Sequence, residues 1–325
     1  MRINRFSLVL CLFLFVLKAQ LYAQLKAAES CDVPFVVTNF DNVLLKDLGP
    51  QDLLVRLGTV PITLDGISVD GGPKRVALIL DPSRNVPEDE WKLEIEMADK
   101  FVGHARPDDK FVFLLVGTDE VPDAFLSPAV VQGQLRKLAS SRPPNTDSSE
   151  RIYDILLTAA KRLDPPMFGD ALFLFGHHED VGSMTDPDQL QELILKDRLR
   201  FFGMSFSDPL RGKVPRDFDP NKPLPASLAP SQLQKMSSAT GNYFSFHSVQ
   251  ALNHPGQTPL FEGFLGDLYA RIAEPYRLRI PMSDIKGQTK LEISVKNMND
   301  RDVRASGIYY PRLIYPCVPP KLTTP

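Results

Sequence analysis

Long apolar runs that alternate with helical patterns constrain this chain more than any other feature. The runs at residues 75–80, 111–116, 171–175 and 201–206 contain few polar residues, as is typical of parallel strands covered on both faces. Amphipathic spacing indicates helices at 87–104, 149–163, 186–199, 231–240 and 260–272, and a short strand at 243–246. The alternation predicts an α/β fold with a doubly wound, mostly parallel sheet flanked by helices.

The two ends of the chain show a different pattern of short strands separated by turns. These strands are expected at 34–37, 53–57, 62–64, 276–280, 290–295 and 303–310. We expect both ends to form one small β subdomain beside the main sheet. The predicted division is a signal peptide at 1–23, an N-terminal β segment at 24–72, the α/β domain at 73–275, and a C-terminal β segment and tail at 276–325.

The start of the chain has the pattern of a signal peptide. Arg2 and Arg5 precede an apolar run at residues 6–17, and Ala23 is a small residue at a suitable distance for cleavage. The sequence therefore predicts a secreted or periplasmic protein that is cut near Ala23. No later run is long enough to span a bilayer. An uncleaved anchor stays open as the alternative, because Leu21 is not a small residue.

The cysteines support an oxidising compartment. Cys11 lies in the predicted signal peptide, which leaves Cys31 and Cys317 in the mature chain. An even number of cysteines in an exported protein favours a disulfide, and we predict that these two are bonded. Two free thiols are the alternative.

Composition and motifs exclude several classes of function. The net charge is −3 and no predicted helix carries a cluster of lysines and arginines, so nucleic-acid binding is not expected. The sequence contains no nucleophile elbow, phosphate loop or dinucleotide fingerprint, and an enzyme is therefore not predicted. The acidic pairs Asp108-Asp109 and Asp119-Glu120 lie at strand ends and are interpreted as solvated turn residues.

Several motifs resemble a known family. Asp81-Pro-Ser-Arg-Asn85, after the first long apolar run, resembles the Asp-x-Ser-x-Ser motif of von Willebrand factor A domains. Four further stretches are similar to exported bacterial proteins of the acidobacterial VWFA-related family, in the same order along the chain. They are residues 48–55, the Arg-Ile-Tyr-Asp-Ile at 151–155, the Thr-Gly-Asn-Tyr-Phe segment within 233–244, and the closing segments 272–278 and 303–310.

The resemblance implies a von Willebrand A fold with a metal-ion-dependent adhesion site at the carboxyl ends of the strands. Asp81 and Ser83 match two of its ligand positions. Asn85 stands in place of a hydroxyl, Glu150 in place of a threonine, and His177 in place of an aspartate. Imidazole is a poor ligand for magnesium, which prefers oxygen ligands in strict octahedral geometry.

The site therefore looks degenerate. We predict no tight magnesium site, and at best a weak calcium or manganese site at Asp81, Ser83, Asn85 and Glu150. Alternatively, Ser83 and Asn85 serve only the turn and cap the helix that follows.

The sequence thus predicts a secreted, non-enzymatic von Willebrand A-like module that binds a protein partner which the sequence does not name. His177, His178 and Asp180 are candidates for partner contact. A cation-dependent module with an unconventional metal site is the first alternative, and a hydrolase with a remodelled metal centre is the second. The proline-rich segment 208–230 is either a supplementary contact or a variable insertion.

Overall fold

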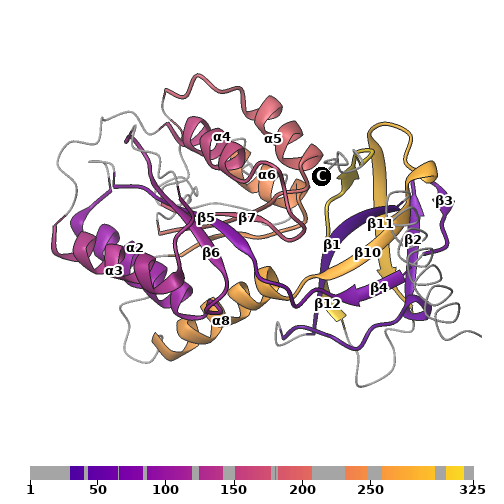
Figure 1. Ribbon diagram of the computed structural model, residues 1–325, viewed down its shortest axis with the longest axis horizontal. Coiled ribbons are helices and arrows are strands. Elements are labelled where there is room, and N and C mark those ends of the chain that lie inside the picture. The colour runs from indigo at the N-terminus through magenta and orange to yellow at the C-terminus, as the bar shows by residue number, and fades with distance from the viewer. Residues whose placement is uncertain are drawn as a thin grey trace, which may run out of the picture.

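The computed structural model describes residues 30–39, 43–64, 66–82, 86–118, 124–141, 151–176, 180, 182–206, 231–247, 258–296 and 305–317. These residues form an α/β body and a body of antiparallel strands, which lie side by side (Figure 1). No helix among them is both long enough and apolar enough to cross a membrane.

A five-stranded parallel sheet forms the centre of the α/β body. Its order is β6-β5-β7-β8-β9, and every neighbouring pair is parallel. The strands are β5 (Arg75–Leu80), β6 (Lys110–Leu115), β7 (Ala171–Phe175), β8 (Arg200–Ser205) and β9 (Phe244–Phe246). They coincide with the predicted apolar runs to within a residue or two, and the predicted fold class is confirmed.

Helices cover both faces of this sheet. One face packs against α2 (Glu88–Gly103), α3 (Pro128–Ser140) and α8 (Thr258–Ala273), and the other against α4 (Ile152–Arg162), α5 (Pro187–Lys196) and α6 (Gln232–Ala239). The strands supply both layers by alternation: in β5, Val76, Leu78 and Leu80 face the first set, whereas Ala77 and Ile79 face the second. Burial on both faces explains why the runs contain so few polar residues.

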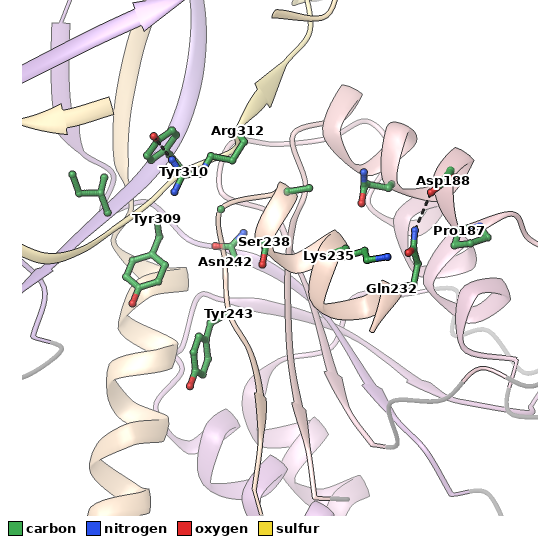
Figure 2. Close-up of a pocket in the computed structure, with 14 residues that line it drawn as sticks. Pro187, Asp188, Gln232, Lys235, Ser238, Asn242, Tyr243, Tyr309, Tyr310 and Arg312 are labelled. Carbon is green, nitrogen blue, oxygen red and sulfur yellow. Dashed lines mark hydrogen bonds between the residues drawn. The ribbon is translucent and has the colours of Figure 1, made fainter. Parts of the chain in front are cut away.

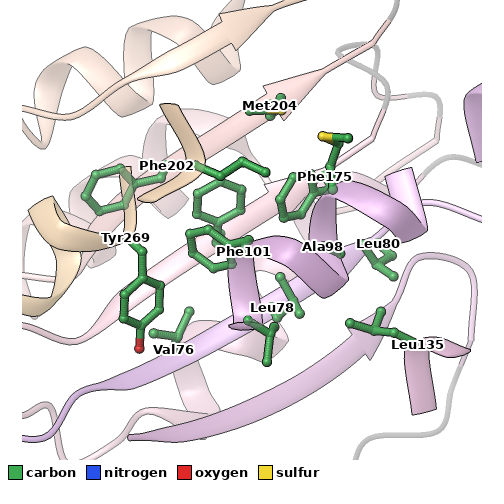
Figure 3. Close-up of a cluster of buried hydrophobic side chains, with 14 of the residues drawn as sticks. Val76, Leu78, Leu80, Ala98, Phe101, Leu135, Phe175, Phe202, Met204 and Tyr269 are labelled. Carbon is green, nitrogen blue, oxygen red and sulfur yellow. The ribbon is translucent and has the colours of Figure 1, made fainter. Parts of the chain in front are cut away.

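Aromatic side chains fill the first of these layers (Figure 3). The ring of Phe101 from α2 lies 4.3 Å from Phe173 and 5.8 Å from Phe175, both on β7, and 5.2 Å from Tyr269 on α8. Tilted and edge-on contacts at these distances add to the free energy gained by burying the rings. The cluster joins two helices to the middle of the sheet.

Two further elements, α3 and the segment before it, were not expected from the sequence. Leu126 forms an antiparallel bridge to Phe111 and thus extends the sheet beyond β6. Pro128 then occupies the first turn of α3, and Val131 and Leu135 face the core. A proline at the helix start and apolar residues four apart were available as signals.

The second body contains two four-stranded antiparallel sheets made from both ends of the chain. One has the order β12-β1-β10-β4 and the other β13-β11-β2-β3. The N-terminal strands are β1 (Ser30–Asn39), β2 (Leu53–Leu57), β3 (Val60–Pro61) and β4 (Gly66–Val69), and the C-terminal ones are β10 (Tyr276–Pro281), β11 (Thr289–Val295), β12 (Ala305–Tyr309) and β13 (Leu313–Ile314). Short 3-10 turns lie at Pro50–Asp52 and Met282–Asp284. The predicted β subdomain of N- and C-terminal segments is confirmed, although residues 62–64 are not a strand and β3, β4 and β13 were not expected.

A buried arginine lies where the two bodies meet. Arg200 begins β8 and is 2% exposed. Its guanidinium donates hydrogen bonds to the carbonyl oxygens of Arg271 (2.7 Å) and Ile272 (2.7 Å) in the last turn of α8, and to that of Gly169 (2.8 Å). Burial lowers the pKa of Arg200 to about 10, which still leaves it charged at neutral pH. The charge satisfies carbonyls that a helix end leaves without partners.

Acidic residues complete this junction. Asp70 accepts from the Nζ of the buried Lys74 (2.7 Å) and from Arg277 on β10 (3.2 Å). Asp109 is fully buried and accepts from the Lys74 backbone (2.7 Å) and the hydroxyl of Tyr269 (2.6 Å). The interpretation of Asp109 as a solvated turn residue was therefore wrong: it organises the start of the sheet.

Cys31 in β1 and Cys317 after β13 form a disulfide, as the sequence predicted. Their Cα atoms are 5.7 Å apart, within the usual range for such bonds. Both cysteines belong to the hydrophobic core of the β subdomain. The bond therefore closes the subdomain covalently.

Replacing both cysteines by serine should destabilise the protein strongly. The bond spans a sequence separation of 286 residues, and in the chain-entropy model so long a loop contributes about 5 kcal/mol. We expect urea denaturation of the oxidised protein and of the Cys31→Ser/Cys317→Ser variant to differ by a large part of this amount. Equal midpoints would contradict the assignment of the bond as a stabilising one.

Candidate functional site

Asp81 lies at the carboxyl end of β5, at the edge of the sheet where open α/β folds bind ligands. Its side chain is fully buried. Gly176, which follows β7, packs directly on it: a Cβ at this glycine would lie 2.5 Å from the Cβ of Asp81. Gly176 also has a φ of +153°, so two demands select glycine here. The ends of β5 and β7 are thus in close contact.

The structure tests little of the predicted metal site. Ser83, Asn85, Glu150, His177 and His178 lie outside the described residues, as do the predicted signal peptide at 1–23 and the segment 208–230. Within the described part of the chain, no group of three or more histidine, cysteine, aspartate or glutamate side chains could hold a metal ion. Asp81 is the one predicted ligand that the structure places, and the described residues around it do not complete a donor set.

Asp180, a predicted partner contact, is engaged within the chain. Its carboxylate accepts hydrogen bonds from the backbone of Tyr153 (3.1 Å) and from the hydroxyl of Ser183 (2.5 Å). The Ser183 hydroxyl also accepts from the backbone of Tyr153 (3.1 Å) and Asp154 (3.3 Å). These bonds satisfy the free N–H groups at the start of α4. The first role of Asp180 is thus to attach the β7–α5 loop to this helix.

Asp154 makes the reciprocal attachment, which the sequence analysis missed. Its carboxylate accepts from the backbone of Met184 (3.1 Å) and Thr185 (2.8 Å) and from the Thr185 hydroxyl (2.6 Å). Burial alone would raise the pKa of Asp154, but the bonds from Thr185 and Met184 outweigh it and lower the pKa. The Arg-Ile-Tyr-Asp motif was a signal of this position, although it did not reveal the partner.

The pinned loop presents an exposed apolar side chain. Met184 is 91% exposed, whereas the residues on both sides of it are fixed by Asp154 and Asp180. Helices of an α/β fold start at the edge where strands end, so the first turn of α4 places Met184 at the same edge as Asp81. A nearly fully exposed methionine between two residues that are held by hydrogen bonds is suited to contact a protein surface.

Two of the family-like motifs meet away from this edge. The turn after α6 contains Thr240, whose hydroxyl accepts from the backbone of Phe201 on β8 (3.2 Å), and Gly241, which has a φ of +72°. Gly241 ends the α6 segment in the left-handed conformation that favours glycine. Its Cα faces the backbone of Tyr310, and a Cβ would lie 1.9 Å from the Tyr310 carbonyl carbon. The Thr-Gly and Tyr-Tyr motifs therefore form a backbone contact between the two bodies.

The chain is similar in structure to several solved proteins. A von Willebrand factor type A protein from Catenulispora acidiphila has 8% identity and a TM-score of 0.44, over 88% of this chain and 74% of that one. The conserved hypothetical protein BatB from Bacteroides thetaiotaomicron has 10% identity and a TM-score of 0.43, over 62% and 99%. For the human COPII-coat protein Sec24c the values are 10% and 0.43, over 75% of this chain and 43% of that one, so the match spans less than half of Sec24c. No family model and no curated protein matches the sequence.

These similarities are remote, and the architecture is described by this chain's own sheet order and flanking helices. It is a doubly wound α/β module joined to a β subdomain, as the sequence predicted. The narrower resemblance to the acidobacterial family stays a prediction.

Replacing Gly241 by alanine should destabilise the contact between the two bodies. The substitution adds a left-handed backbone cost of about 1–2 kcal/mol and an overpacking cost of about 1–3 kcal/mol. Gly287→Ala is a matched control, because Gly287 has a φ of +67° but no atom within 4 Å of its added Cβ. In denaturant unfolding, the control should show the backbone cost alone. Equal losses for the two variants would refute the close packing on Tyr310.

Replacing Asp154 by alanine should loosen the β7–α5 loop and lower the free energy of unfolding by about 1–3 kcal/mol, as expected for charge-assisted hydrogen bonds. The folded-state pKa lies below the ordinary value of 3.8, so this contribution is present at neutral pH and is lost as the pH falls through the folded pKa. Glu192→Ala is the control, since Glu192 forms only an exposed pair with Lys196. A difference between wild type and Asp154→Ala that persists unchanged well below pH 3.8 would contradict this role.

Proposed function

We propose that this chain is an exported, non-enzymatic von Willebrand A-like module that binds a protein partner at the carboxyl edge of its parallel sheet. The observation that carries the proposal is Met184, displayed on a loop that Asp154 and Asp180 hold in place. Because hydrogen bonds already fix the residues on both sides of Met184, less conformational entropy is lost when a partner binds, which favours binding. Burying the methionine against a partner contributes about 1.5–3 kcal/mol.

Export is supported by the charged and apolar start of the sequence and by the disulfide. Bonds such as Cys31–Cys317 persist in oxidising compartments and are rare in the cytosol. A secreted or periplasmic location agrees with both observations.

Binding without a tightly held metal is the form of the function that we favour. Asp81 is buried beneath Gly176, where the β7–α5 loop begins. In the sequence, His177 stands where the resemblance implies an acidic ligand. The cation-dependent alternative keeps Asp81 as a ligand, with Ser83, Asn85 and Glu150 beside it. The two alternatives differ in whether a chelator abolishes binding.

The test is capture of the partner from the exported fraction, followed by measurement of the dissociation constant for the identified protein. Met184→Ser should weaken binding by about tenfold or more, the equivalent of the lost apolar burial. Met167→Ser is the control: Met167 is 55% exposed but lies in the loop that precedes β7, at the opposite edge of the sheet. EDTA should leave the affinity unchanged.

Two results would contradict the proposal. If Met184→Ser binds the partner as tightly as wild type, the pinned loop is not the contact. If EDTA abolishes binding, magnesium restores it, and Asp81→Ala prevents the restoration, the cation-dependent alternative replaces the metal-free one.

A further inference from the structure

A groove of about 980 Å³ runs along α6, between α5 and the β subdomain (Figure 2). Lys235 and Ser238 line it from the exposed side of α6. Tyr243 and Tyr309 lie toward one end, and Asp188 lies at the other. None of these residues belongs to the site around Asp81 and Met184 at the carboxyl edge of the parallel sheet.

The groove reaches the edge of a β strand. Ile308 and Tyr309 of β12 line it, as does Tyr310 just after the strand, and consecutive strand residues point to opposite faces of a sheet. A hollow that both Ile308 and Tyr309 line therefore reaches the edge or the end of this strand. Among the described strands, β12 is the last in its sheet, next to β1. The backbone at Tyr310 is covered by Gly241, but along Ala305–Tyr309 the side of β12 away from β1 is placed to pair with an added extended segment, as in peptide recognition by strand addition.

Two of the three charged residues that line this groove are cations. Lys235 and Arg312 are both exposed, and the guanidinium of Arg312 is held 4.2 Å from the centre of the Tyr310 ring. The acidic residue in the lining, Asp188, already accepts a hydrogen bond from Gln232 (2.9 Å). This positive balance occurs in a chain whose net charge is −3.

The positive surface continues onto the β subdomain. A second hollow of about 270 Å³ shares Tyr310 and Arg312 with the groove and crosses the faces of β2 and β11. There Arg56 and Lys290 lie around Glu292, whose carboxylate is paired with Lys290 at 2.7 Å. The lowered pKa of Glu292, due first to Lys290 and then to Arg56 and Arg312, reflects this excess of positive charge.

From the edge of β12, the tyrosine rings, and the cations Lys235 and Arg312, we propose that this groove binds an extended acidic peptide segment of a protein partner. The strand edge supplies main-chain hydrogen bonds, and Lys235 and Arg312 attract carboxylates on alternate side chains. The proposal names a partner surface in addition to the Met184 loop and does not require that loop to be a contact.

The test uses a fluorescein-labelled poly-L-glutamate peptide and fluorescence anisotropy with the full mature protein. Wild type should bind the peptide, and binding should weaken as salt screens the charges. Lys235→Glu and Arg312→Glu should each weaken it by about tenfold, because each reversal removes an attraction and adds a repulsion. Arg312→Gln removes the charge without adding a repulsion and should have a smaller effect. Thermal melts of every variant check that the protein is folded.

Lys92→Glu is the matched control. Lys92 is an exposed lysine on α2, a helix on the opposite face of the sheet from α6, so its reversal changes the net charge equally without touching the groove. Met184→Ser should leave peptide binding unchanged. This result separates peptide binding in the groove from partner binding through the Met184 loop. The proposal is overturned if poly-L-glutamate does not bind, if Lys92→Glu weakens binding as much as Lys235→Glu, or if polygalacturonate binds in the groove and the peptide does not.

Discussion

The junction of the two bodies depends on a buried arginine. Arg200 begins β8, yet its guanidinium closes the last turn of α8, the helix that leads directly into β10. It therefore fixes where the chain leaves the α/β module and enters the β subdomain. Asp70 and Asp109 surround this junction with acceptors for Lys74, Arg277 and Tyr269. Buried charges of this kind need every partner in place, and the two bodies share those partners.

The strands of the parallel sheet could be predicted from sequence because burial on both faces leaves long apolar runs. The helix α3 was missed although its signals, Pro128 followed by Val131 and Leu135, were present. The strand β4 is different: its four residues include Gly66 and Ser68, and pairing with β10 decides their conformation. Local sequence does not contain that information.

The candidate site shows the same division more sharply. The position of Asp81 followed from an acid after an apolar run. The roles of Asp154 and Asp109 did not follow, because their partners lie far along the chain: Thr185 is 31 residues from Asp154, and Tyr269 is 160 residues from Asp109. The local sequence around an aspartate does not show whether its carboxylate fixes a distant loop or is solvated. The Arg-Ile-Tyr-Asp and Thr-Gly motifs marked the right places, but only the fold assigned them to loop attachment and to the contact between the bodies.

The disulfide has a mechanical consequence. Cys31 and Cys317 are 286 residues apart in sequence, and both lie in the core of the β subdomain. Tension applied to chain segments outside these two cysteines passes through one covalent link and bypasses everything between them. Without the bond, the enclosed chain could be pulled out to roughly 1000 Å. The bond prevents this extension. A chain closed in this way carries no load between the two cysteines while it is being pulled from outside them.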